Sequence, residues 1–308
     1  MTQADINCIA FIGTGVMGAA MAGHLMDEGF VLRVHNRTRH KAEALLERGA
    51  VWCDTPGEAA RTADAVITMV GYPADVEETY LGAGGIIDSA GPGTLLIDMT
   101  TSSPALAERL ERAAAEPGLM VLDAPVSGGD VGAKNATLTI MVGGDPEAYR
   151  RALPLFEVMG RNVAHHGGPG AGQHCKMANQ IAIAASMFGL AECLAYAKSA
   201  GLDPGRVIET LSGGSAQTWS LQNYGPRVLS GDFAPGFYVK HFVKDLRIAT
   251  VEADAMGVTL PGLALAKRLY ESLEAGGGSE LGTQALWVLY ADAAARQEAG
   301  VTASLDTQ

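Results

Sequence analysis

Residues 11–18 read Phe-Ile-Gly-Thr-Gly-Val-Met-Gly, and this stretch joins an apolar run at residues 6–12 to a helical pattern at residues 16–28. Strand, glycine-rich turn and helix in this order are typical of a dinucleotide-binding βαβ unit, in which backbone N–H groups at the helix N-terminus hold a pyrophosphate. An ordinary turn that needs glycine for its own conformation is the alternative interpretation.

Each glycine of this loop has a separate expected role. Gly13 permits the tight turn, Gly15 lets the backbone approach the phosphates, and Gly18 lets the helix pack on the strand. The predicted cofactor-binding residues of the loop are Gly13, Thr14, Gly15, Val16, Met17 and Gly18.

Outward from this loop, short apolar runs alternate with amphipathic segments through the first two-thirds of the chain. Such alternation predicts βαβ units and an α/β, Rossmann-type, doubly wound parallel sheet. Strands are expected at residues 6–12, 31–35, 65–70, 95–98, 121–124, 138–142 and 162–165. Helices between them are expected at residues 16–28, 41–48, 74–81, 104–115 and 146–159.

A glycine-rich stretch at residues 167–172 marks the predicted domain boundary. Beyond it, long segments rich in Ala, Leu and Met predict an all-α second domain. Its helices are expected at residues 173–200, 203–212, 240–256, 263–275 and 283–297. We therefore expect a Rossmann domain at residues 1–166 and an all-α substrate and dimerisation domain at residues 167–308, entered by a long interdomain helix, with the active site in the cleft between the domains.

Composition narrows the function classes. The 308-residue chain carries 34 acidic and 22 basic residues, a formal net charge of −12, which argues against general nucleic-acid or membrane binding. Four widely spaced cysteines without a Cys-x-x-Cys pair fit a reducing compartment. The start of the chain lacks a secretory signal, and the uncharged run at residues 177–191 is too short and too polar to span a bilayer. We expect a soluble, cytoplasmic protein.

The end of the second predicted strand bears on which dinucleotide binds. Residues 33–39 read Arg-Val-His-Asn-Arg-Thr-Arg and contain no acidic residue to accept a hydrogen bond from a ribose 2′-hydroxyl. Asn36 can bond the ribose, while Arg37 and Thr38 can bind a 2′-phosphate, which favours NADP over NAD. A solvated basic loop is the alternative. Met69 and Val70, where the strand at residues 65–70 ends, are further cofactor-binding candidates.

Four motifs in fixed order carry a family resemblance. They are Gly-x-Gly-x-x-Gly-x-x-Met-Ala at residues 13–22, Asp-Ala-Pro-Val-Ser-Gly-Gly at 123–129, Gly-Ala-Gly-Gln-His-Cys-Lys-Met-Ala-Asn-Gln at 170–180, and Lys-Asp-Leu at 244–246. The chain resembles the β-hydroxyacid dehydrogenases, which are 6-phosphogluconate dehydrogenase-like and include 3-hydroxyisobutyrate dehydrogenase and tartronate semialdehyde reductase. The resemblance extends from about residue 6 to residue 292.

The resemblance implies a nicotinamide-dependent oxidoreductase that interconverts a 3-hydroxy acid and its semialdehyde. It implies that Lys176 is the catalytic lysine, supported by Asn179, and that the protein is a homodimer or homotetramer. It places Ser127, Gly128 and Gly129 at the substrate carboxylate, and Thr101 and Lys244 where the family contacts cofactor and substrate. Without the resemblance, Lys244 would be read as part of an exposed helical pair.

The residues support this chemistry independently. Hydride transfer to a carbonyl builds negative charge on its oxygen, so a proton donor is needed, and a buried lysine beside another cation can serve. On a helix, Lys176, Asn179 and Gln180 share one face, which makes Gln180 a substrate-binding candidate. A solvated surface lysine is the alternative.

The Ser127-Gly128-Gly129 stretch follows the predicted strand at residues 121–124, at the edge of the sheet where ligands bind. Its small residues leave backbone N–H groups free to bind a carboxylate. A plain tight turn is the alternative.

Other functions are compatible with parts of this pattern. Tartronate, succinic or glyoxylate-type semialdehydes are alternative substrates for the same machinery. Imine reduction is disfavoured because Lys176 is present, and a non-catalytic dinucleotide-binding module remains a further alternative. His174 and Cys175 do not form a thiol nucleophile pair, because adjacent residues of a helix point about 100° apart. His165-His166 lacks partners at metal-ligand spacing, so we expect no metal site.

Overall fold

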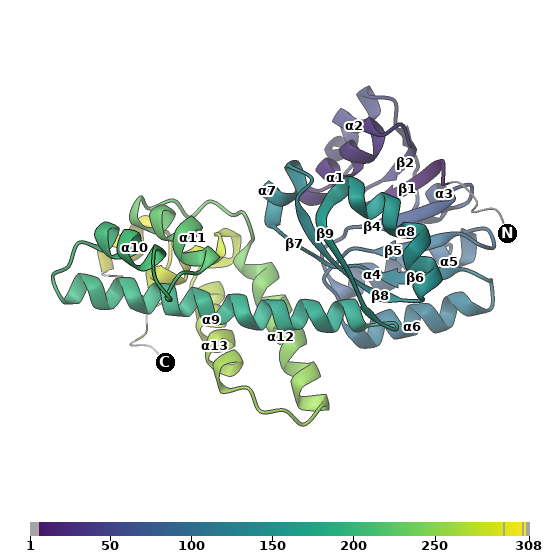
Figure 1. Cartoon of the computed structure of the whole chain (residues 1–308). Helices are drawn as coiled ribbons and strands as arrows, with labels where there is room; N and C mark the ends of the chain where they lie inside the picture. The colour runs from purple at the N-terminus through teal and green to yellow at the C-terminus, as the bar shows by residue number, and fades with distance from the viewer. Residues whose placement is uncertain (1–5, 292, 304, 306–308) are drawn as a thin grey trace. The chain divides into compact units, whose positions relative to one another are not determined.

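The computed structural model describes residues 6–291, 293–303 and 305. The first part of the chain is built around one β-sheet (Figure 1). Its strand order is β3-β2-β1-β4-β5-β6-β8-β7, with β9 beside β8. The strands are β1 (Cys8–Ile12), β2 (Val31–His35), β3 (Val51–Trp52), β4 (Ala65–Thr68), β5 (Leu95–Asp98), β6 (Met120–Asp123), β7 (Val126–Ser127), β8 (Leu138–Gly144) and β9 (Gly160–Gly167). The six strands from β3 to β6 along this order are parallel, so the predicted doubly wound Rossmann-type fold is confirmed.

Helices cover both faces of the sheet because its strands are apolar on both sides. In β1, Ile9 and Phe11 face one core with α1 (Val16–Asp27) and α8 (Pro146–Met159). Ala10 and Ile12 face the other core, with α3 (Pro56–Ala60), α4 (Pro73–Leu81) and α6 (Pro104–Ala115). Successive side chains of β1 therefore point into two different cores. The glycine loop follows directly after Ile12, at the carboxyl end of this strand.

Several strands and α-helices have no counterpart in the sequence-based prediction. They are β3, β7, α3, α5 (Ile86–Ser89), α7 (Gly129–Lys134) and α11 (Trp219–Leu229). All but α11 span two to six residues, too few to show a period. Helix α11 is longer, but Pro226 interrupts its pattern, and only the cap formed by the Thr218 hydroxyl, which accepts from Leu221 N, marks its start.

The chain divides into two compact units, residues 1–176 and residues 177–308. The division falls after Lys176, ten residues beyond the predicted boundary (176 minus 166), because the helix that begins at Ala171 starts in the first unit. This helix, α9 (Ala171–Ser199), continues into the second unit.

Helices make up the second unit, as predicted. They are α10 (Pro204–Ser212), α11, α12 (Val239–Ala255), α13 (Pro261–Ala275), the 3₁₀ turns η2 (Gly278–Glu280) and η3 (Thr283–Tyr290), and α14 (Ala293–Glu298). The core of this unit contains Met177 and Met187 of α9, packed with buried residues of α12 and α13.

The prediction of one helix over residues 283–297 is wrong. Residues 283–290 form the 3₁₀ segment η3, and Ala291 is extended before α14 begins. Most of η3 is buried, and Gln284 Nε2 donates to the carbonyl oxygens of Asp232 and Ala234. These tertiary contacts override the α-helical preference of the sequence. Residue 292 lies outside the described residues.

Helix α9 also corrects the length argument against a membrane-spanning segment. The helix has 29 residues, and an 18-residue window with a mean hydropathy of 1.4 makes it long and apolar enough to cross a bilayer. Core helices of soluble proteins meet the same criteria, and 39% of that window is buried within this chain. Its buried polar side chains, Gln173, Lys176 and Gln180, hydrogen-bond to the protein itself.

Candidate functional site

The glycine loop is tightly packed at its first and last glycines. Gly13 has a φ of +98°, and a Cβ there would lie 2.2 Å from the carbonyl oxygen of Met69. A Cβ on Gly18 would lie 1.9 Å from the carbonyl oxygen of Gly13. These two glycines are therefore required by the fold of the loop itself.

Gly15 differs, because among the described residues, its chain neighbours and the backbone of its own helix aside, nothing lies within 4 Å of the position where its Cβ would be, and its φ of −74° suits any residue. It stands at the N-cap of α1, which has no side-chain cap and no acidic residue in its first turn. The neighbouring Thr14 hydroxyl is buried and has no hydrogen-bond partner in the part of the chain that the structure describes. Open space, free helix N–H groups and an orphaned hydroxyl fit a bound pyrophosphate, which an added side chain would obstruct.

Asn36, at the end of β2, joins the two predicted parts of the cofactor site. Its Oδ1 accepts from Thr14 N at 3.0 Å, and its Nδ2 donates to Thr38 O at 2.9 Å. The side chain therefore shapes the loop. The guanidinium of Arg37 lies 3.7 Å from Asp75 at the surface, and its side chain is 90% exposed. Such an exposed pair contributes little to stability, which leaves Arg37 available to a ligand.

Met69 and Val70 line the same loop. The carbonyl of Met69 packs against Gly13, and Val70 N donates to Thr100 Oγ1 at 3.0 Å. Thr101 follows in the same segment and is half-buried. Asp98, which the sequence-based prediction missed, fixes this segment because its Oδ1 accepts from Thr68 Oγ1 at 2.8 Å and from Thr100 N at 3.0 Å.

The Ser127-Gly128-Gly129 stretch ends β7 and begins α7. Gly128 and Gly129 have φ values of +132° and +62°, which glycine adopts without strain. A Cβ on Gly128 would come within 3.3 Å of Leu138 Cδ2. The glycines thus serve the turn as well as leaving backbone N–H groups that can bind an anion.

Lys176 lies in the first unit and is only 6% exposed. Its Nζ donates to Val126 O at 2.8 Å, next to Ser127. The structure thus brings the predicted catalytic lysine together with the predicted carboxylate-binding loop. A solvated surface lysine does not describe this residue.

Asp123, at the end of β6, is a second functional candidate that the sequence-based prediction missed. Its Oδ1 accepts from Gly170 N and its Oδ2 from Gln173 N, both at 2.8 Å, so it holds the start of α9. Burial raises the pKa of Asp123 to about 6, and the nearby Asp98 adds to the shift, although the backbone hydrogen bonds oppose it.

This raised pKa predicts a pH-dependent stability. The folded state binds the proton more tightly than the unfolded chain, so the contribution of Asp123 is complete below about pH 4 and is lost as the pH rises through about 6. The full shift corresponds to about 3 kcal/mol, of which about 1.4 kcal/mol falls between pH 5 and pH 7.5. Urea unfolding of the wild type and of Asp123→Asn at both pH values measures it. A difference between the two proteins that does not change with pH contradicts the prediction.

In the second unit, three predicted site residues are connected through Asp245 by two hydrogen bonds and an ion pair. Asn179 Nδ2 donates to Gln180 Oε1 at 2.7 Å, and Gln180 Nε2 donates to Asp245 Oδ2 at 2.6 Å. Lys244 Nζ lies 3.0 Å from Asp245 Oδ1. The Lys244 side chain is 12% exposed and Asp245 is buried, so this is not an exposed helical pair.

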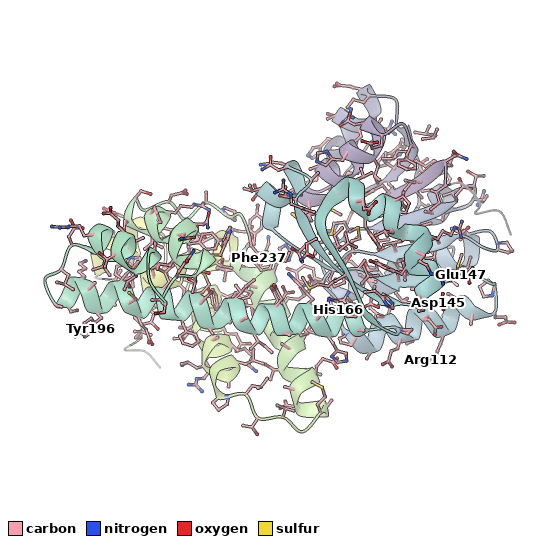
Figure 2. The ribbon with its side chains drawn as sticks, viewed as in Figure 1. Arg112, Asp145, Glu147, His166, Tyr196 and Phe237 are labelled. Carbon is pink, nitrogen blue, oxygen red and sulfur yellow. The ribbon has the colours of Figure 1, made fainter. Side chains whose placement is uncertain are left out.

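A separate hollow of about 350 Å³ lies at the start of α8, where Figure 2 labels Asp145. Asp145 Oδ1 accepts from Glu147 N and Ala148 N, so this carboxylate caps α8. His165 Nε2 is 2.8 Å from Gly144 O, and its ring stacks on Tyr149. Among the described residues, no group of three or more His, Cys, Asp or Glu could hold a metal ion.

Comparison with known families matches both parts of the chain. Residues 8–168 match the NAD-binding domain of 6-phosphogluconate dehydrogenase. Residues 170–290 match the NAD-binding domain of NADP-dependent 3-hydroxyisobutyrate dehydrogenase.

Individual relatives span nearly the whole chain. The probable mitochondrial 3-hydroxyisobutyrate dehydrogenase-like protein 1 of Arabidopsis thaliana is 50% identical over 90% of this chain and 83% of its own length. The 2-hydroxy-3-oxopropionate reductase of Escherichia coli is 40% identical over 90% of this chain and 95% of its own. The structure of Mycobacterium tuberculosis 3-hydroxyisobutyrate dehydrogenase with L-serine has a TM-score of 0.84 at 33% identity, covering 92% of this chain and 98% of that one. The chain therefore belongs to the β-hydroxyacid dehydrogenase family and is an oxidoreductase that uses a nicotinamide dinucleotide.

Proposed function

We propose that the chain interconverts a short 3-hydroxy acid and its semialdehyde with NADP(H), and that Lys176 is the general acid and base. The observation that supports this most directly is the buried Lys176 ammonium, hydrogen-bonded to Val126 O beside the Ser127-Gly128-Gly129 loop. A buried cation beside the backbone N–H groups of Gly128 and Gly129 suits a substrate that carries a carboxylate and a reacting oxygen.

Different residues of this chain would bind the cofactor, bind the substrate and transfer the proton. A nicotinamide dinucleotide, when bound, supplies or accepts the hydride, and Gly13, Thr14 and Gly15 would hold its pyrophosphate. As a carbonyl is reduced, negative charge grows on its oxygen, and Lys176 Nζ donates a proton to that atom. In the oxidative direction the neutral amine accepts the hydroxyl proton. Ser127, Gly128 and Gly129 bind the carboxylate, and Asn179 supports the lysine.

The preference for NADP rests on the end of β2. That segment offers no acidic side chain, while Arg37 is exposed and can pair with a 2′-phosphate. The similarity of residues 170–290 to the NADP-dependent 3-hydroxyisobutyrate dehydrogenase model also supports NADP. We further propose that the protein works in the cytoplasm as a homodimer or homotetramer.

The 40% identity to a 2-hydroxy-3-oxopropionate reductase supports a second candidate, reduction of tartronate semialdehyde. The same lysine and carboxylate loop would serve it, because that substrate is also a short carboxylate with an aldehyde. The two candidates differ in substrate side chain and not in chemistry.

A substrate panel tests the function. Purified protein is mixed with NADPH or NADH and 2-hydroxy-3-oxopropionate, succinic semialdehyde, methylmalonate semialdehyde or glyoxylate, and with NADP+ or NAD+ and 3-hydroxyisobutyrate or L-serine. Absorbance of the reduced nicotinamide reports turnover. We expect kcat/KM to favour NADPH over NADH by about tenfold or more, equivalent to about 1.4 kcal/mol.

The variant Arg37→Ala tests the preference for NADP over NAD, and NADH serves as its control cofactor. We expect it to lower kcat/KM with NADPH and to leave kcat/KM with NADH unchanged, since only NADPH carries the 2′-phosphate. Equal losses with both cofactors argue against this role of Arg37. Absence of turnover on the whole panel contradicts the proposed function.

A further inference from the structure

Gln173 lies in the first turn of α9 and is completely buried. Its Nε2 donates to Thr100 O at 2.8 Å, and its Oε1 accepts from Ser102 N at 2.9 Å. The Gln173 amide thus hydrogen-bonds to the backbone of the two residues that flank Thr101, in the segment that follows β5. A buried amide with both ends bonded orders its surroundings, because losing either partner leaves a polar group unsatisfied.

Asp123 holds the same helical turn from β6. Its two carboxylate oxygens accept from the backbone N–H groups of Gly170 and Gln173. The turn is pressed closely against the sheet, because a Cβ on Gly172 would lie 2.4 Å from Met141 O and 2.6 Å from Asp123 O. The start of α9 is therefore fixed by side-chain contacts at the ends of β5 and β6 and by backbone packing at β8.

Lys176 follows Gln173 by three residues, within one helical turn. Because the helix is rigid over this distance, the position of its first turn sets where Lys176 Nζ meets Val126 O. These hydrogen bonds also extend to Val70, a predicted cofactor-binding residue, because Val70 N donates to Thr100 Oγ1. All of these residues belong to the first unit.

We propose that Gln173 and Asp123 form a buried clamp that positions Lys176 and joins it to the segment around Thr101. Both are positioning residues, because they act through Lys176 and not on the substrate. This inference rests on the proposed function for its effect on turnover, but the placement of the lysine can be measured separately.

The test compares Gln173→Leu with wild type by two measurements. Acetylation of lysines by acetic anhydride, followed by mass spectrometry, reports access to Lys176, with exposed Lys198 of the same helix as internal reference. We expect Lys176 to react about tenfold faster in the variant and Lys198 to be unchanged. In steady-state assays we expect kcat to fall about 10- to 100-fold while KM changes little, because a small displacement of a catalytic group slows the reaction strongly.

His174→Ala is the matched control, because His174 is the adjacent residue of the same turn and is exposed. It should change neither measurement. If Gln173→Leu does not fold, as judged by circular dichroism, Gln173→Glu provides the same test, because it keeps the acceptor for Ser102 N and loses the donor to Thr100 O.

Unchanged acetylation of Lys176 together with unchanged kcat in a folded Gln173 variant overturns the clamp. A wild type without turnover on the panel removes the proposed function, but the acetylation rates still decide whether the clamp positions the lysine. The two failures are therefore distinguishable.

Discussion

Lys176→Ala should lower kcat by about 1,000-fold while the affinity for NADPH stays within about threefold of wild type, because general acid–base catalysis contributes about 10²- to 10⁴-fold. The Lys176 ammonium donates to Val126 O beside the Ser127-Gly128-Gly129 loop, so we expect its loss to spare dinucleotide binding at the glycine loop. Steady-state kinetics on the best substrate of the panel and fluorescence titration with NADPH measure the two quantities.

Removing a buried lysine also leaves Val126 O without this donor, which costs about 1 kcal/mol of stability. Lys176→Met keeps most of the side-chain volume and should show the same kinetic loss with less effect on folding. Lys198→Ala, near the other end of α9 and exposed, is the matched control and should keep wild-type kinetics. Turnover retained by Lys176→Ala and Lys176→Met refutes the catalytic role.

The parts of the fold that could be predicted are those with a strong local pattern. The strand at β1 shows its burial on both faces as a continuous apolar run, and the glycine loop fixes where the strand ends and α1 begins. Short elements could not be predicted in this way. Helix α7 has six residues and starts at two glycines, so its position follows from its contact with α1, where His24 Nε2 lies 3.0 Å from Ala133 O.

The candidate site shows the same limit. Lys176 and the Ser127 loop stand out because they occur within recognisable motifs. Asp98 lies outside those motifs, and Asp123 and Gln173 lie inside them without revealing their role, because each acts through partners far away in the chain, up to 73 residues for Gln173 and Thr100. A buried carboxylate at a strand end is the signal that could have marked the two aspartates: Asp98 and Asp123 each end a strand that is otherwise apolar.

Asn36 illustrates a different limit. The sequence predicts a ribose ligand at this position, and the side chain is indeed beside the glycine loop. The structure adds that its oxygen and amide nitrogen already bond to Thr14 N and Thr38 O. The position of Asn36 after the second strand predicts that it lies near the glycine loop. Its hydrogen-bond partners could not be predicted, because they depend on the tertiary fold.

The glycine loop provides the second large effect, because two neighbouring substitutions should separate binding from folding. Gly15→Ala should lower the affinity for NADPH by about 10- to 100-fold, or about 1.4 to 2.7 kcal/mol, since a methyl group there enters the open space that the pyrophosphate would occupy. The free energy of unfolding without cofactor should change by less than about 1 kcal/mol, because the φ of Gly15 suits alanine and no protein atom is close.

Gly18→Ala should behave in the opposite way. Its Cβ would lie 1.9 Å from Gly13 O, so α1 or the loop must move, and such overpacking costs about 3 kcal/mol or more of stability. Urea unfolding without cofactor and titration with NADPH compare both variants with Gly91→Ala, which also adds a methyl group in open space but lies outside the loop. Gly15→Ala binding NADPH as tightly as Gly91→Ala would show that the N-terminus of α1 does not hold the dinucleotide, because a bound phosphate and an added methyl group cannot share that space.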